Sequence, residues 1–398
     1  MANIYRHSVV TIIAAVSQDS NQGFLHKREE ISVEGLFTLP ISLPGQKVGT
    51  VKLCREEEQI YRYPPEPISK RAWTLQESIL SPRCLIFATQ QVFWKCTKAF
   101  WKDGGFTDWS TFQENSGCWT NLGLAYTSRG IASFGGGDFV SVESALPPAR
   151  LELARRWFKV AEAYSSRQLS VPEDKLPALS SIAAMYYDIL KDDYLAGLWQ
   201  SSLLPGLLWV SNAQEEDRPN RICPTWSWLS IDSPVNFTYF YRPAAEWQSF
   251  AKIHKCNTVP FFDFAPYGQL KEGSFLKITS PAFTMILECS YSQGTGRFTL
   301  SSFKPSVHVL TSFFPDIKMH DYTGMRVECL VLFRTTWQRW TAAGLVLCPF
   351  DLENGLYKRI GYFEAGPGSC QSWTEAERKA LHASGWIFNA PRRTFTVV

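Results

Sequence analysis

The chain has 398 residues, of which 45% are hydrophobic and 19% are charged, a composition typical of folded globular proteins and unlike that of disordered ones. Its 40 Lys and Arg against 37 Asp and Glu give a net charge of +3. That value is too near neutral to indicate nucleic acid or an acidic membrane surface as a partner. The longest strongly apolar run, Val9 to Val16, is too short to span a bilayer.

The ten cysteines predict a cytoplasmic protein with reduced thiols. No two of them have the close spacing of a zinc knuckle or a thioredoxin-like motif. Met1 to Tyr5 lacks the basic lead and apolar stretch of a secretory signal. We therefore expect thiols that are free and mostly buried, as is usual in the cytosol.

The first elements predict a piece of parallel sheet. Residues 2–8 have the character of a helix end, and Val9 to Val16 is a β-branched run with little alternation. Such a run suits a strand covered on both faces. Only eight residues precede it, so we expect a sheet that lacks upstream strands.

A short helix is predicted over residues 70–80, with Ser69 as its N-cap and Pro82 ending it. Residues 85–87 and 92–96 then form a predicted strand pair around a polar turn.

We expect four regions in the chain: residues 1–100, a variable loop-rich insertion over 101–150, a helical region over 151–222, and a β-rich domain over 223–398. In the helical region, apolar residues recur at helical spacing over 151–164 and again over 176–190, the second helix being capped by Asp174. A shorter helical segment is expected within 194–209.

The last region alternates short β-type runs with turn signals. The predicted strands are 251–257, 275–279, 285–290, 325–334, 342–347, 358–364 and 393–397, with a short helix over 372–384. The fold class predicted from this order is α+β.

Common catalytic signatures are absent from the sequence, including the nucleophile elbow, the phosphate-binding loop, the dinucleotide fingerprint and the zinc-protease helix. The six histidines are scattered and do not pair at ligand spacing. We expect neither a metal nor a cofactor.

The helix over 70–80 carries the most informative polar residues. Trp73, Gln76, Glu77 and Leu80 fall on one face, and a face with Trp and Leu is normally buried. A carboxylate buried with it needs a cation or several donors, which the flanking Arg71 and Arg83 could supply. Two interpretations stay open: a buried ion-pair network that fixes the helix on the sheet, or a ligand-binding or catalytic carboxylate at Glu77.

The second notable stretch is Pro224 to Trp228, in which Trp226 and Trp228 alternate with Ser227. On a strand, both indoles would face one way. The favoured interpretation is an aromatic seam in the core. The alternative is a stacking platform for carbohydrate or bases, which lacks an accompanying basic stripe.

The stretch Lys70 to Phe87, KRAWTLQESILSPRCLIF, followed by QQVFWKC, closely resembles the third sequence block of the fungal heterokaryon-incompatibility (HET) domain. That block has an R-x-W-x-x-Q-E helix, here with Arg71, Trp73, Gln76 and Glu77, and a strand ending in a W-x-C-like pattern, here at Trp94. Residues 4–28 resemble the segment before it. Residues 164–190, the Pro224–Trp228 stretch and residues 344–365 resemble regions downstream of many such domains. The first two blocks of the family are missing, so the resemblance implies an N-terminally truncated domain.

The resemblance implies a partial α/β N-terminal region similar to TIR domains, followed by a helical middle and a C-terminal antiparallel β domain. It also implies a role in non-self recognition and regulated cell death, exerted through protein partners and without nucleic acid or a membrane span. Because some TIR relatives cleave NAD, a hydrolase that uses Glu77, with NAD as substrate, is the enzymatic alternative. A degenerate, non-functional fragment is the third possibility.

Overall fold

The computed structural model describes residues 2–25, 36–43, 47–54, 66–89, 92–97, 100–102, 105–106, 148–212, 223–237, 247–292, 297–302, 311–317, 324–335, 341–365 and 387–398. The chain divides into two compact units, Met1–Ser128 and Arg129–Val398, and each is described by itself. The predicted helix over 372–384 and most of the predicted insertion over 101–150 lie outside the described residues.

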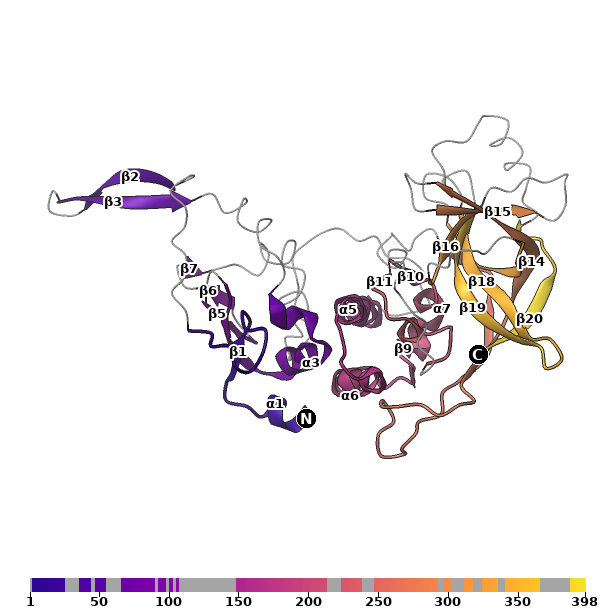
Figure 1. The fold of residues 1–398 in the computed structure, drawn as a ribbon, viewed down its shortest axis with the longest axis horizontal. Helices are drawn as coiled ribbons and strands as arrows, with labels where there is room; N and C mark the ends of the chain where they lie inside the picture. Colours follow the sequence, from indigo (N-terminus) through magenta and orange to yellow (C-terminus); the bar gives the residue numbers. More distant parts are fainter. Residues whose placement is uncertain are drawn as a thin grey trace. The chain divides into compact units, whose positions relative to one another are not determined.

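The first unit is built on a small sheet with one parallel pair (Figure 1). Its strand order is β1-β4-β5-β6-β7, and only β1 and β4 run parallel. The strands are β1 (Thr11–Ala14), β4 (Arg83–Phe87), β5 (Val92–Cys96), β6 (Phe100–Lys102) and β7 (Gly105–Phe106). A separate antiparallel hairpin joins β2 (Leu36–Leu43) and β3 (Lys47–Cys54).

Three short helices accompany this sheet, namely α1 (Ala2–Arg6), η1 (Pro67–Lys70) and α3 (Ala72–Leu80). The helix α3 lies in the crossover between the parallel strands β1 and β4, the connection that a parallel pair requires. Ile13, Cys84 and Ile86 form the core under it, with Ile68 and Phe93 packed against them.

The expectations for this unit are confirmed for the helix and the strand pair, with three corrections. The first strand is shorter than Val9 to Val16, and it is covered on one face only, since Ile13 is buried while Ile12 is 59% exposed. Ser69 does not cap α3, because Pro67 starts a 3-10 turn in which the Ser69 hydroxyl donates to the Glu66 carbonyl. The N-cap is Arg71, without a side-chain cap.

The second unit begins with helices and short hairpins (Figure 1). Both long helices are confirmed, α5 (Pro148–Ser165) and α6 (Pro177–Leu190). The N-cap of α6 is Leu176 rather than Asp174, which lies in the preceding 3-10 turn η2 (Pro172–Asp174). The shorter elements that follow are β8 (Tyr194–Leu195), β9 (Leu198–Trp199), η3 (Gln200–Ser202), α7 (Leu203–Gly206), β10 (Val210–Ser211), η4 (Trp228–Ser230) and β11 (Val235–Asn236).

The helix expected within residues 194–209 is largely a hairpin instead. Ala196 and Gly197 both have positive φ, at 46° and 90°, which is the backbone of a tight two-residue hairpin turn. Helical geometry begins only at Leu203.

The rest of the unit is a nine-stranded sheet. Pairings between β14, β17, β18, β19, β16 and β15 return to β14, so six strands close a ring around an apolar core that includes Met285, Phe313 and Phe363. The strands are β12 (Trp247–Ser249), β13 (Lys252–Asn257), β14 (Phe275–Ser292), β15 (Arg297–Ser302), β16 (Thr311–Pro315), β17 (Arg326–Thr335), β18 (Thr341–Asp351), β19 (Leu356–Ala365) and β20 (Arg392–Val397). The α+β class and an antiparallel β region are confirmed, apart from one parallel pairing of β19 with β20. The TIR-like character of the first unit stays a prediction.

Six cysteines are free thiols, of which Cys84, Cys223 and Cys329 are buried and Cys96, Cys256 and Cys348 are half-buried. Within the described ranges, no helix is long and apolar enough to cross a bilayer. In the same ranges, no three His, Cys, Asp or Glu side chains gather closely enough to hold a metal ion.

Candidate functional site

The helix α3 docks on the sheet of the first unit through buried residues that include Leu75, Gln76 and Leu80. Trp73 and Glu77 are half-buried, and Arg71 and Arg83 are exposed. The four residues predicted to share one buried face are therefore not equally buried. The Gln76 amide lies in the interior, whereas the Trp73 indole and the Glu77 carboxylate are half-buried.

Glu77 is held by a phenol. The Tyr5 hydroxyl of α1 hydrogen-bonds to the Glu77 carboxylate, and burial, followed by the charge of Glu77 and this bond, raises the pKa of Tyr5. Arg83 instead donates to the carbonyl of Val9 over 3.4 Å. Sequence reasoning missed Tyr5, because nothing in a pattern shows that two residues this far apart will meet.

A chain of hydroxyl groups fixes the end of α3 to the first strand. Ser81 donates to the carbonyl of Glu77 over 2.7 Å and lies 2.7 Å from the Thr11 hydroxyl. Because the single hydroxyl hydrogen of Ser81 goes to the carbonyl, Thr11 is the donor in the second bond. Ser8 lies 3.1 Å from Thr11, so three hydroxyls follow one another from the main-chain carbonyl of Glu77.

We expect Ser81→Ala to lower the free energy of unfolding of the first unit by about 1 kcal/mol, since it removes a bond to a helix carbonyl and the 2.7 Å partner of the Thr11 hydroxyl. Calorimetric unfolding of the full chain measures this, with the exposed Ser20→Ala as control. Equal unfolding of the two variants would contradict the role given to Ser81.

Behind the helix, Lys95 and Cys84 share one acceptor. They are direct cross-strand partners, and the Lys95 amine and the Cys84 thiol lie 3.0 and 3.8 Å from the carbonyl of Ser78. Burial lowers the pKa of Lys95 and raises that of Cys84. The pair secures the last turn of α3, where cations are favourable.

The second sequence candidate lies in the core of the second unit. Trp226 and Trp228 are fully buried, which fits the core interpretation and leaves neither face of an indole open for stacking on a sugar or base. The expected strand is wrong, since Trp228 starts the 3-10 turn η4. There the Ser227 hydroxyl accepts from the Leu229 N–H over 3.0 Å, and Pro224 is half-buried at the start of the segment.

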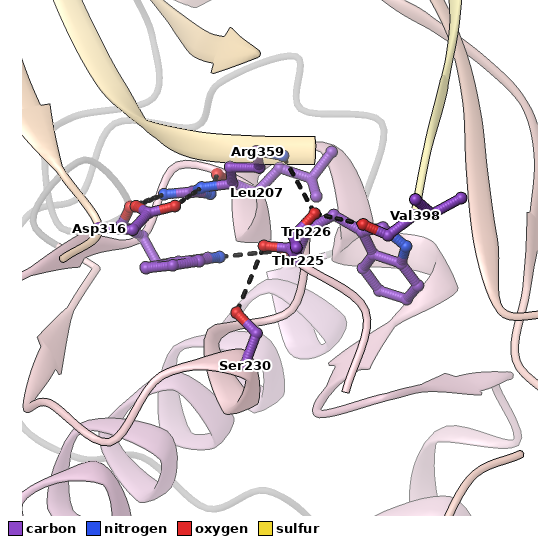
Figure 2. Close-up of polar contacts among 8 residues, drawn as sticks. Leu207, Thr225, Trp226, Ser230, Asp316, Arg359 and Val398 are labelled. Carbon is purple, nitrogen blue, oxygen red and sulfur yellow. Dashed lines mark hydrogen bonds and ion pairs between the residues drawn. The ribbon is translucent and has the colours of Figure 1, made fainter. Parts of the chain in front are cut away.

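A buried arginine, which sequence reasoning missed, joins the helical part of the unit to its sheet (Figure 2). Arg359 of β19 makes a bidentate pair with Asp316, at 2.9 and 3.0 Å. It also donates to the carbonyls of Leu207 and Trp209 over 2.5 and 2.7 Å, and its guanidinium lies 3.4 Å from the Trp209 ring centre.

Thr225 closes this arrangement from the other side (Figure 2). Its hydroxyl accepts from the Arg359 main-chain N–H over 3.0 Å and donates to the main-chain oxygen of Val398. The Trp209 indole donates to the carbonyl of Trp226 over 3.1 Å. These bonds tie Arg359 of β19 to the Leu207–Trp209 segment, to the Thr225 segment and to Asp316.

The comparisons with known proteins agree with the sequence resemblance over one segment. The family model described as heterokaryon incompatibility protein (HET) matches residues 1–77. No curated protein and no solved structure matches the chain. The matched segment begins with α1 and ends at Glu77, the last residue of the R-x-W-x-x-Q-E motif, so the similarity to HET domains covers this part of the chain.

Proposed function

We propose that this chain acts in fungal non-self recognition and regulated cell death, in the cytoplasm, and that it acts through protein contacts made by the unit that contains the HET segment. The family match over residues 1–77 supports the biological role. The contact mode rests on one observation, an apolar row on the sheet face opposite α3.

This row, which we call the open-face row, consists of residues in direct cross-strand register. Ile12 pairs with Leu85, Leu85 with Trp94, and Trp94 with Trp101. Because side chains alternate along a strand, these four lie on the face opposite Ile13 and Ile86, which pack under α3. Ile12 is 59% and Trp101 47% exposed, while Leu85 and Trp94 between them are half-buried. A contiguous, partly exposed apolar row of this kind is typical of protein interfaces.

One charge limits the kind of partner. Arg83 is exposed and, two residues before Leu85 on β4, lies on the same face. The complementary partner is a protein that offers an apolar strand or helix with a carboxylate opposite Arg83.

The test is expression of the full chain in a filamentous fungal host, with cell viability as the readout. We expect the native chain to kill and Ile12→Asp to reduce killing at least about tenfold, since a buried interfacial charge without a partner costs several kcal/mol. Leu352→Asp is the matched control and should kill like the native chain. Leu352 is also an exposed aliphatic residue, but it lies in the second unit. Equal killing by the native and Ile12→Asp chains, at equal protein levels, contradicts the contact mode.

The enzymatic alternative, NAD cleavage by Glu77, is favoured by one observation: a half-buried carboxylate next to the Tyr5 phenol, whose pKa it helps to raise. The same cells separate the two functions. Under the contact proposal, Glu77→Gln keeps killing and cellular NAD stays constant. Loss of NAD that Glu77→Gln prevents and Ile12→Asp does not would favour the hydrolase.

A further inference from the structure

The connection between β13 and β14 forms an arm, residues 258–274, that carries three exposed phenylalanines. Phe261, Phe262 and Phe264 are 48%, 44% and 85% exposed. Their rings contact one another in sequence, with centroids 4.7 Å apart for the first pair and 5.1 Å for the second. Single exposed apolar residues are ordinary, but a stack of three aromatic rings in water marks a surface that meets something apolar.

The arm holds these rings in a fixed hairpin. The Phe261 N–H donates to the Gln269 carbonyl over 2.7 Å, and the Lys271 N–H donates to the Val259 carbonyl over 2.7 Å. Tyr267 packs its ring against a tyrosine of α6, with centroids 5.9 Å apart. The phenylalanines are therefore presented by an ordered element, and little conformational entropy is lost when they bind.

The strands at the base of the arm present a basic face. β14 lies between β13 and β20, and the outward rows across the three strands are Lys255–Lys277–Thr396 and Lys252–Thr279–Thr394. Arg392 extends the face along β20. Lys252, Lys255, Lys277 and Arg392 are all exposed, and within the described residues none of them has an ion pair.

Two details of this face favour an anion bound over it. Lys255 and Lys277 are direct cross-strand partners, and like charges placed opposite each other destabilise a sheet unless a counter-charge sits over them. Beside them, the exposed His254 ring lies 2.7 Å from the Thr279 hydroxyl, which lies 2.6 Å from the Thr394 hydroxyl. The face thus combines fixed hydroxyl groups with cations that have no ion pair among the described residues.

We propose that the arm and the basic face together bind the surface of a membrane that contains anionic lipids. Lysines near such a surface are attracted to lipid phosphates, and aromatic rings settle at the level of the headgroups. A protein pocket would need to match both a protruding aromatic tip and a broad cationic face, whereas an anionic bilayer offers both chemistries in one plane. Asp263 lies between the phenylalanines and Glu272 follows Lys271, and these two acids keep the tip at headgroup depth.

The test is co-sedimentation of the full chain with lipid vesicles. We expect strong binding to mixed phosphatidylserine and phosphatidylcholine vesicles, weak binding to phosphatidylcholine alone, and loss of binding as salt shortens the Debye length from about 10 Å towards 3 Å. Lys255→Glu/Lys277→Glu should weaken binding to the mixed vesicles at least about tenfold. Phe264→Ser should weaken it severalfold while keeping the preference for phosphatidylserine.

The matched control is Lys70→Glu/Arg326→Glu, which changes the net charge equally at exposed residues that are not part of the basic face. It should bind like the native chain. Equal binding to both vesicle types, or equal weakening by both double variants, overturns the proposal. So does tighter binding to soluble inositol phosphates or RNA than to vesicles, or a self-association that Phe264→Ser abolishes.

Discussion

Arg359→Ala is expected to lower the free energy of unfolding of the second unit by about 3–5 kcal/mol, because it leaves a carboxylate buried without its cation. Asp316 is buried, and burial raises its pKa while Arg359 opposes that rise. The substitution also strands the carbonyls of Leu207 and Trp209, which accept from the same guanidinium. Denaturant unfolding followed by tryptophan fluorescence measures the loss.

The control for this prediction is a second variant that removes both charges. Arg359→Met/Asp316→Leu keeps the apolar volume and should recover part of the loss, since no unpaired charge remains in the interior. Arg326→Ala, an exposed arginine on β17, should stay within about 0.5 kcal/mol of the native chain. A cost below about 1 kcal/mol for Arg359→Ala would mean that the interior of this unit is wetter than its geometry shows.

The parts of the fold that could be predicted from sequence are those governed by local periodicity. The helices α5 and α6 repeat apolar residues at helical spacing, and the strands β4 and β5 are short apolar runs beside a turn. Their limits were found within a few residues, because burial of one face decides the structure of such segments. The resemblance of the Arg71–Glu77 motif to the HET family was also predictable, and it is confirmed over residues 1–77.

The segments that could not be predicted are those where one backbone angle or one side-chain bond decides. The stretch 194–209 reads as a helix, but two positive φ angles at Ala196 and Gly197 turn it into a hairpin. Trp226–Trp228 reads as a strand, but a Ser227 hydroxyl bond tightens it into a 3-10 turn. Periodicity carries no information on either feature.

Contacts between distant residues were also beyond the sequence. Arg359 and Asp316 are 43 positions apart in the sequence, and Tyr5 and Glu77 are 72 positions apart. The basic face shows the same limit for charge. A net charge of +3 over the whole chain gave no sign that three neighbouring strands would gather Lys252, Lys277 and Arg392, because composition averages over position.

Gly197→Ala is expected to destabilise the second unit by about 3–5 kcal/mol, through backbone strain and overpacking together. Gly197 has φ of 90°, and an added Cβ would lie 2.7 Å from the indole nitrogen of Trp228 and 2.8 Å from Leu229. The carbonyl of Gly197 accepts from both Trp157 and Trp228, over 2.8 and 2.9 Å. A shift of this turn therefore strands two buried indole donors at once.

Gly273→Ala separates the two causes. Gly273 has a similar φ of 99° but open space around its missing side chain, so its alanine variant carries only the backbone cost of about 1–2 kcal/mol. Thermal unfolding of both variants, with near-ultraviolet circular dichroism of the tryptophans, should show the larger loss and the altered aromatic signal for Gly197→Ala alone. Equal losses would mean that the aromatic core rearranges around the added methyl group. They would contradict the role given to the Gly197 carbonyl in holding Trp157 and Trp228.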